Sequence, residues 1–186
     1  IGPHKEAPAY SPSGLYKPGA ANGVAMTQDD IDAVVASFAQ AALDAKNIGF
    51  DAIEVHGAHG YLVDQFFWEG TNQRTDKYGG SLENRTRFGV EIVNAIRAAV
   101  GNDFTIIFRF SQWKQQDYNA KLCQTPEELD TFLGLLSDAG VDIFHASTRR
   151  FWVAEFAGSD LGLAGWTKKL TNKPVITVGN VGLDAD

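Results

Sequence analysis

The sequence predicts an α/β fold built on parallel strands. Four short apolar segments of strand type alternate with segments of helical periodicity along the chain. Each strand segment is a nearly continuous apolar run, which is typical of strands buried on both faces, and such strands join through right-handed crossovers. A closed eight-stranded (β/α)8 TIM barrel takes about 250 residues. The 186 residues therefore predict one domain that is part of such a barrel.

The amino-terminal part contains the first predicted helix. Residues 1–23 are rich in Pro, Gly, Ser and Ala and predict a surface loop, and residues 24–186 carry the β/α units. Thr27 and Asp30 have the spacing of a helix-capping pair. Helical spacing of apolar residues then continues to Gly49. The chain has no initiator methionine, so we expect a piece of a longer protein.

The next strand and helix follow directly. Residues 51–56 predict a strand, and residues 81–100 predict a helix with Ser81 as its cap and Gly101 as its terminator. Residues 105–110 predict the second strand.

The remaining elements repeat this alternation. Thr125 and Pro126 combine a helix cap with a first-turn proline, and their helix is expected to run to Gly140. The sequence then predicts a strand, a short helix and a last strand, over residues 141–146, 166–170 and 174–178.

Composition excludes several classes of protein. Sixteen basic against 23 acidic residues give a net charge of −7, which is the wrong sign for a protein that binds nucleic acid phosphates. The single Cys123 allows no internal disulfide and fits a reducing compartment, so we expect the cytoplasm. No apolar run has membrane-spanning length, and no secretory signal precedes the first helix, so no membrane partner is expected. A homo-oligomer stays open.

The most informative segment contains two histidines and a tyrosine at the end of the first predicted strand. His56, His59 and Tyr61 lie within six residues, with glycines that allow a tight exit from the strand. Catalytic groups of barrel enzymes cluster at strand ends, so both imidazoles are expected to bind one ligand oxygen. The alternatives are imidazoles satisfied within the core, or a two-histidine metal site with Glu54 or Asp64 nearby. The metal site would indicate a metal-dependent hydrolase; we assign no metal ligand.

Two later strands also end on residues that suggest a ligand. Arg109 ends an apolar strand, where a buried cation needs an anionic partner, either a ligand or an internal carboxylate. Gly179 and Asn180 follow the last strand, where barrel enzymes commonly offer backbone N–H groups to a phosphate. Taken alone, a glycine followed by an asparagine is also an ordinary turn.

Taken together, these segments resemble one enzyme family. The histidine turn, residues 64–66 (DQF), residues 72–88 (NQRTDKYGGSLENRTRF), residues 108–111 (FRFS) and residues 178–180 (VGN) are similar to the Old Yellow Enzyme family of flavin-dependent ene-reductases. The resemblance extends over most of the chain from Thr27 onward. It implies a barrel that binds FMN at the carboxyl ends of its strands, with this chain covering strands four to seven.

The resemblance also implies residue roles. His56 and His59 would donate hydrogen bonds to the carbonyl oxygen of an α,β-unsaturated substrate, and Tyr61 would protonate its α-carbon. Arg109 would bind the flavin ring, and Gly179 with Asn180 would bind the FMN phosphate. NADH or NADPH would be the electron donor.

Other residues are given structural roles. The glycines and cap residues of the segment from Tyr78 to Arg87 have local reasons for their positions, in a loop and at a helix cap, so this segment is expected to be structural. His145 is expected to be a satisfied core histidine. Residues 149–156 could line the substrate mouth or hold the phosphate of a nicotinamide donor, but packing of loop aromatics explains them equally well, so they are left outside the site. One further alternative is an inactive half-barrel that associates through its open sheet edges and holds no flavin.

Overall fold

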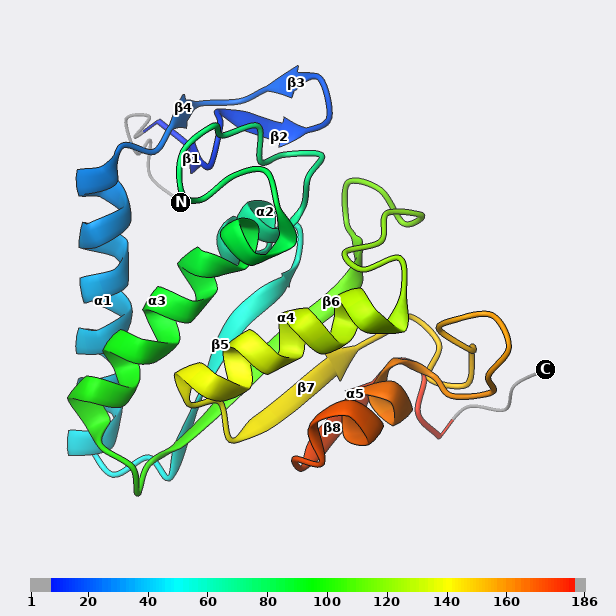
Figure 1. The fold of residues 1–186 in the computed structure, drawn as a ribbon. Helices are drawn as coiled ribbons and strands as arrows, with labels where there is room; N and C mark the ends of the chain where they lie inside the picture. Colours follow the sequence, from blue (N-terminus) through cyan, green and yellow to red (C-terminus); the bar gives the residue numbers. More distant parts are fainter. Residues whose placement is uncertain (1–7, 183–186) are drawn as a thin grey trace.

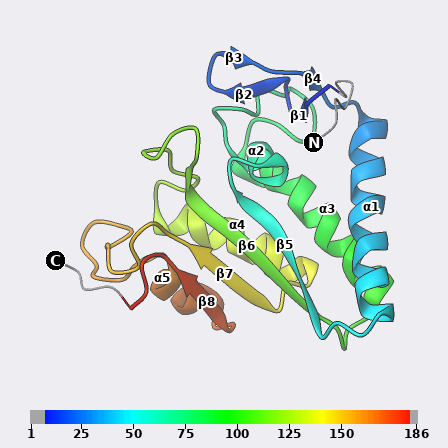
Figure 2. The same cartoon turned by 180° about the vertical axis from the view of Figure 1, so that it is seen from behind.

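A computed structural model describes residues 8–182 and contains a four-stranded parallel sheet (Figure 1). The strands lie in chain order: β5 (Ala52–His59), β6 (Thr105–Lys114), β7 (Ile143–Ser147) and β8 (Val175–Val178). Seen from behind, the strands lie in front of the helices (Figure 2). The predicted α/β class with parallel strands is confirmed.

Four long helices cover one face of this sheet: α1 (Gln28–Asn47), α3 (Leu82–Val100), α4 (Pro126–Ala139) and α5 (Leu163–Thr171). They lie side by side in chain order, each against the next (Figure 1). α3, α4 and α5 are the crossovers between consecutive strands, as parallel pairing requires. No helix in the described part of the chain is both long and apolar enough to cross a bilayer.

The helix ends agree with the predicted caps. The Thr27 hydroxyl accepts from the Asp30 amide, and the Asp30 carboxylate accepts from the Thr27 amide, at 3.2 and 2.8 Å. The hydroxyls of Ser81 and Thr125 cap α3 and α4 by accepting from the backbone amide three residues later. Gly140 ends α4 in the left-handed conformation, with φ of 116°, where a side chain would be strained.

The first two sheet strands extend beyond their predicted ends. β5 continues from residue 56 to His59, and β6 continues from residue 110 to Lys114. A register shift between Gly57 and His59 marks the end of regular pairing. Glycines and polar residues made these positions read as loop, whereas β5 and β6 continue to pair up to His59 and Lys114. As a result His59 lies within the strand.

The prediction of a surface loop over residues 1–23 is wrong for part of that segment. Residues 1–7 lie outside the described residues. Arg74 donates from Nη1 to the carbonyls of Pro12 and Met26, at 2.8 and 2.6 Å. These two hydrogen bonds hold both ends of the segment of residues 12–26. No local periodicity announces this tertiary contact. The segment pairs as four short strands, β1 (Tyr10–Ser11) with β4 (Val24–Ala25) and β2 (Leu15–Lys17) with β3 (Ala20–Ala21).

The short helix α2 (Leu62–Phe67) was not predicted from the sequence. Its six residues are fewer than two helical turns, too few to show a periodicity. α5 begins three residues before its predicted start at residue 166, and β7 begins two residues after its predicted start at residue 141.

Aromatic side chains fill the layer between sheet and helices. Phe110 of β6 lies 5.7 Å from Phe132 of α4, and Phe132 lies 5.1 Å from Phe67 of α2, measured between ring centroids. Phe108 and Phe144 are fully buried on the same side. Because strand side chains alternate between faces, the neighbouring positions point to the other face of the sheet.

Glycine at position 89 lets α3 approach α2 closely. A Cβ at Gly89 would lie 2.7 Å from Phe67 Cζ, so we expect Gly89→Ala to lower the free energy of unfolding by about 1–3 kcal/mol through overpacking. Gly134 of α4 is the matched control because no atom lies within 4 Å of its Cβ position. Gly134→Ala should raise stability by up to about 1 kcal/mol. Denaturant unfolding measures both, and equal effects of the two substitutions would contradict this packing.

Candidate active site

The carboxyl end of β5 brings the predicted catalytic side chains together. The ring of His56 lies 5.3 Å from the ring of His59 and 5.3 Å from that of Tyr61, between centroids. His59 and Gly60 both have positive φ, 63° and 80°, and this tight turn separates the strand from α2. A Cβ at Gly57 would lie 2.6 Å from the Phe108 ring, so that position requires glycine.

A buried ion pair holds this turn. The Asp64 carboxylate accepts from the Gly60 amide at 2.7 Å and from Lys114 Nζ at 2.6 Å, and neither side chain of the pair has exposed surface. Lys114 also donates to the Ser111 carbonyl at 3.2 Å. Burial raises the pKa of Asp64, while Lys114 and the Gly60 amide oppose that rise. The pair connects the end of β6 to the turn after β5.

His59 is fixed from three sides. Its amide donates to Ser111 Oγ at 2.9 Å, and its Nε2 lies 2.7 Å from Ser147 Oγ on β7. Its ring stacks on Trp113, with centroids 4.6 Å apart and an interplanar angle of 29°. Ser147 Oγ also accepts from Arg109 Nη2 at 3.2 Å. His59 and Arg109 thus meet at one hydroxyl group.

Both imidazoles are held in the neutral form at pH 7. Burial lowers the pKa of His59 to about 4, and the nearby Arg109 adds to this effect. Burial and Arg109 also lower the pKa of His56, and Glu54 partly opposes them. A neutral imidazole still carries one N–H, so each ring keeps one hydrogen-bond donor.

Arg109 lacks the partner that a buried cation needs. Its Nε is buried and has no hydrogen-bond partner among the described residues, and its side chain forms no ion pair there. An electron-rich ring edge or an anion would satisfy it. This unpartnered nitrogen fits the flavin-ring contact that the resemblance implies for Arg109, and that contact stays a prediction.

Tyr61 is exposed. Its side chain is open to solvent, and its hydroxyl lies 3.5 Å from Gln115 Oε1, which is a long hydrogen bond. It is the N-terminal cap residue of α2 but makes no side-chain cap bond. The phenol is therefore available to a ligand.

Gly179 and Asn180 form a tight turn after β8. Both have positive φ, 138° and 55°, and a Cβ at Gly179 would lie 2.5 Å from the Thr148 carbonyl oxygen. The Phe151 amide donates to the Gly179 carbonyl at 3.0 Å, so the turn lies against the segment after β7. This backbone requires glycine, which agrees with a specialised turn. Its contact with a phosphate stays a prediction.

The Tyr78 to Arg87 segment has the structural role expected of it. Tyr78 is buried and donates to Glu91 Oε2 at 2.8 Å. Arg85 and Arg87 donate to the carbonyls of Phe67 and Lys77, at 2.9 and 2.8 Å.

His145 differs from the satisfied core histidine that the sequence predicted. Its Nδ1 pairs with Glu54 Oε2 at 2.6 Å, and its buried Nε2 has no partner. It lies on the sheet face away from the helices, beside Arg109 in the strand register. A histidine inside an apolar run gives no sign of which sheet face it occupies.

Sequence reasoning missed Ser147, Trp113 and Lys114. Serine and tryptophan follow β-type residues in many proteins, so no signal marked them. Lys114 carried no usable signal either, because its register with the histidine turn of β5 is known only from the structure. A metal site receives no support, because the described residues contain no group of three or more His, Cys, Asp or Glu side chains that would hold an ion.

Comparison with known proteins agrees with this geometry. The sequence profile of the NADH:flavin oxidoreductase / NADH oxidase family matches residues 3–186. The chain belongs to this family. The resemblance to Old Yellow Enzyme and the expected barrel class are both confirmed, and the family implies FMN as cofactor with a nicotinamide nucleotide as reductant.

Individual relatives cover most of the chain. An NADH oxidase of Thermoanaerobacter brockii is 42% identical over 83% of the chain and 24% of its own length. An NADPH dehydrogenase of Clostridium acetobutylicum is 36% identical over 83% of the chain and 45% of its own length. The structure of morphinone reductase in complex with tetrahydroNAD matches 96% of the chain and 51% of its own, with a TM-score of 0.77 and 28% identity. The chain thus spans about half or less of these relatives.

The buried ion pair should dominate the stability of the site. Lys114→Met leaves the Asp64 carboxylate buried without its cation, so we expect a loss of about 3–5 kcal/mol in the free energy of unfolding. Adding Asp64→Asn removes the uncompensated charge and should recover most of that loss. Denaturant unfolding of the two single variants and the double variant measures this. Additive losses would show that the two side chains do not interact.

The neutral state of His59 makes stability depend on pH. The pKa of His59 falls from 6.5 to about 4 on folding, so the unfolded chain binds more protons between these values. The contribution of neutral His59 to the free energy of unfolding should be fully present above pH 6.5. It should fall by on the order of 2 kcal/mol as the pH drops toward 4. His59→Gln should flatten this dependence. Unfolding measured at several pH values tests it, and an unchanged slope in the variant would contradict it.

Proposed function

We propose that this protein is an FMN-dependent oxidoreductase that reduces the C=C bond of α,β-unsaturated carbonyl compounds with NADH or NADPH. The observation that carries the proposal is the pair of neutral imidazoles at the end of β5, with Arg109 on the neighbouring strand. The family membership supports the flavin and the reductant. Because the chain spans only part of its relatives, the complete reaction is part of the proposal.

The two histidines polarise the substrate. One N–H from each of His56 and His59 binds the carbonyl oxygen, which draws electrons from the conjugated double bond and leaves its β-carbon open to hydride. His59 Nε2 already meets an oxygen, Ser147 Oγ at 2.7 Å, and the substrate oxygen takes that place. Fixed donors of this kind need no reorganisation during the reaction.

Tyr61 supplies the proton. A phenol is protonated at neutral pH, and the Tyr61 ring lies 5.3 Å from the ring of His56, beside the site of the carbonyl group. Its proton goes to the α-carbon once hydride has reached the β-carbon. The net change is one hydride and one proton added across the double bond.

The flavin, when bound, supplies the hydride that it has taken from the nicotinamide nucleotide. Arg109, with its unpartnered Nε, binds the electron-rich edge of the ring. The backbone N–H groups of the turn at Gly179 and Asn180 bind the phosphate. The orphaned guanidinium nitrogen is the feature of this chain that fits the cofactor.

Location and assembly remain predictions. A small unsaturated carbonyl compound is the expected partner, a homo-oligomer stays open, and the cytoplasm is the expected compartment.

Replacing both histidines should abolish the reduction of the double bond. We expect His56→Ala with His59→Ala to lower the rate at which reduced enzyme reduces an enone such as 2-cyclohexenone by at least about 10²–10³, because the oxyanion donors are lost. Rapid mixing of chemically reduced enzyme with the enone measures this step alone. His145→Gln is the matched control, since it removes an imidazole from the same sheet face and leaves both donors.

Flavin content is measured first by visible absorbance. The inactive half-barrel alternative predicts no bound flavin, and the metal-dependent hydrolase predicts a colourless protein with a bound ion. An enone rate unaffected by the double substitution, in flavin-loaded protein, would remove the assigned role of the histidines.

A further inference from the structure

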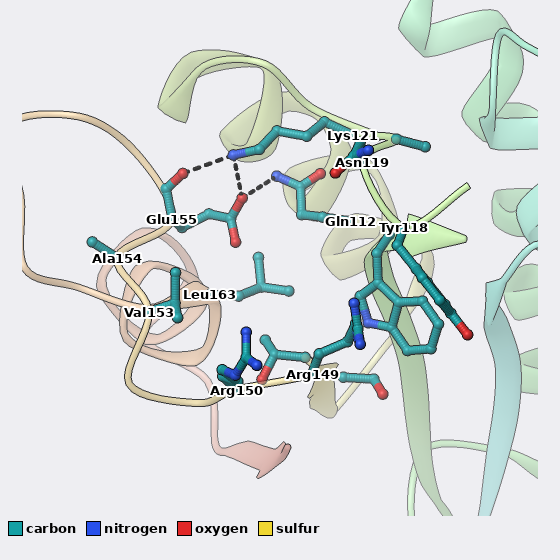
Figure 3. Close-up of a pocket in the computed structure, with 14 residues that line it drawn as sticks. Gln112, Tyr118, Asn119, Lys121, Arg149, Arg150, Val153, Ala154, Glu155 and Leu163 are labelled. Carbon is teal, nitrogen blue, oxygen red and sulfur yellow. Dashed lines mark hydrogen bonds and ion pairs between the residues drawn. The ribbon is translucent and has the colours of Figure 1, made fainter. Parts of the chain in front are cut away.

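A cavity of about 330 Å³ lies beside the candidate active site, between the segments that follow β6 and β7 (Figure 3). Trp113 and Ser147 line it, and the same two residues contact His59 by stacking and by hydrogen bonding. The cavity therefore shares a wall with the site of the two histidines. Its volume is at the lower end of the range of about 300–1,000 Å³ typical of small-molecule pockets.

Charged side chains occupy two sides of this cavity. Arg149 and Arg150 lie on one side, and Lys121 with Glu155 lies on the opposite side (Figure 3). Lys121 Nζ pairs with Glu155 Oε1 at 2.9 Å, so these two charges compensate each other. Arg149 and Arg150 have no carboxylate at ion-pair distance within residues 8–182. The cavity thus carries two uncompensated positive charges.

The guanidinium of Arg149 is already oriented. Its Cζ lies 4.2 Å from the ring centroid of Tyr118, a cation–π contact that holds it over the aromatic ring. By contrast, Arg74 pairs with Asp76 and Arg97 pairs with Asp142, both at 2.6 Å. In a chain with a net charge of −7, two arginines left without carboxylates in one cavity indicate a site for an anion.

Arginine pairs suit phosphate above other anions. The planar guanidinium forms two parallel hydrogen bonds to phosphate oxygens, and an arginine is the usual partner of the 2′-phosphate that distinguishes NADPH from NADH. We propose that this cavity binds the adenosine end of the nicotinamide nucleotide, and that Arg149 and Arg150 bind the 2′-phosphate of NADPH. This inference rests on the proposed function, since it assigns a second site to the same reductant.

Other ligands of the reaction fit the cavity less well. An unsaturated carbonyl compound is neutral and gains nothing from two guanidinium groups. The FMN phosphate is an anion, but the turn assigned to it, Gly179 and Asn180, is absent from the cavity lining. The nicotinamide nucleotide carries its phosphates away from its reacting ring, which agrees with a charged cavity next to the histidine site.

Binding of a nucleotide fragment tests the proposal without turnover. Calorimetry on the flavin-loaded protein should show adenosine 2′,5′-bisphosphate binding at least about tenfold more tightly than 5′-AMP, since a charged hydrogen bond is worth about 1.5–3 kcal/mol. Arg149→Gln and Arg150→Gln should each remove most of this preference. Lys168→Gln is the matched control, because Lys168 lies on α5, donates to the Asn172 carbonyl and is absent from the lining.

Steady-state kinetics gives the second readout. The ratio of kcat/KM for NADPH to kcat/KM for NADH should fall by about tenfold in each arginine variant through a higher KM for NADPH. Equal binding of the two fragments by the unsubstituted protein, or a preference that survives both substitutions, would overturn the proposal. Weaker FMN binding in the arginine variants, with fragment binding intact, would assign the cavity to the flavin phosphate. If the fragment binds through the two arginines but the protein does not reduce an enone, the proposed reaction is rejected and the nucleotide site is kept.

Discussion

The buried ion pair between Asp64 and Lys114 is the constraint on which the candidate site depends. Two charges without exposed surface are costly unless each is fully bonded, and here the Asp64 carboxylate also accepts from the Gly60 amide. Lys114 ends β6 and Asp64 lies in α2, so the pair joins the two elements on either side of the turn. It fixes the backbone on which His59 and Tyr61 are displayed.

The alternation of strand side chains separates stability from chemistry. One row across the sheet, Val55, Phe108, Phe144 and Val175, lies against the helices, and the next row, His56, Arg109, His145 and Ile176, lies on the other face. The aromatic core therefore sets the spacing of the polar row without contributing to it. In β5 and β6 the ligand-facing groups His56 and Arg109 each follow a core residue directly.

Arginines without a carboxylate partner among the described residues add positive charge around the row of His56, Arg109 and His145. Burial, with Arg109 adding to it, lowers the pKa of both His56 and His59, so each imidazole is uncharged at pH 7 and keeps one hydrogen-bond donor. Arg149 and Arg150 extend the positive region along the segment after β7, next to the cavity that Ser147 shares with His59. Three arginines without a carboxylate partner among the described residues thus lie on β6 and directly after β7.

The sequence by itself determined the α/β class, the helix ends and the cluster of His56, His59 and Tyr61, because caps, periodicity and strand-end motifs are local properties of the chain. The need of Arg109 for a partner was also predictable, since a permanent charge that follows an apolar run is costly to bury alone, although β6 continues past it to Lys114. Only the tertiary structure decided the extent of β5, the pairing of residues 10–25, and the contacts of Ser147 and Lys114 with the histidine turn. The extent of β5 and the contacts of Ser147 and Lys114 depend on residues 50 or more positions apart meeting in space, and no local pattern encodes which side chain lies across a sheet or which buried charge meets its counter-charge.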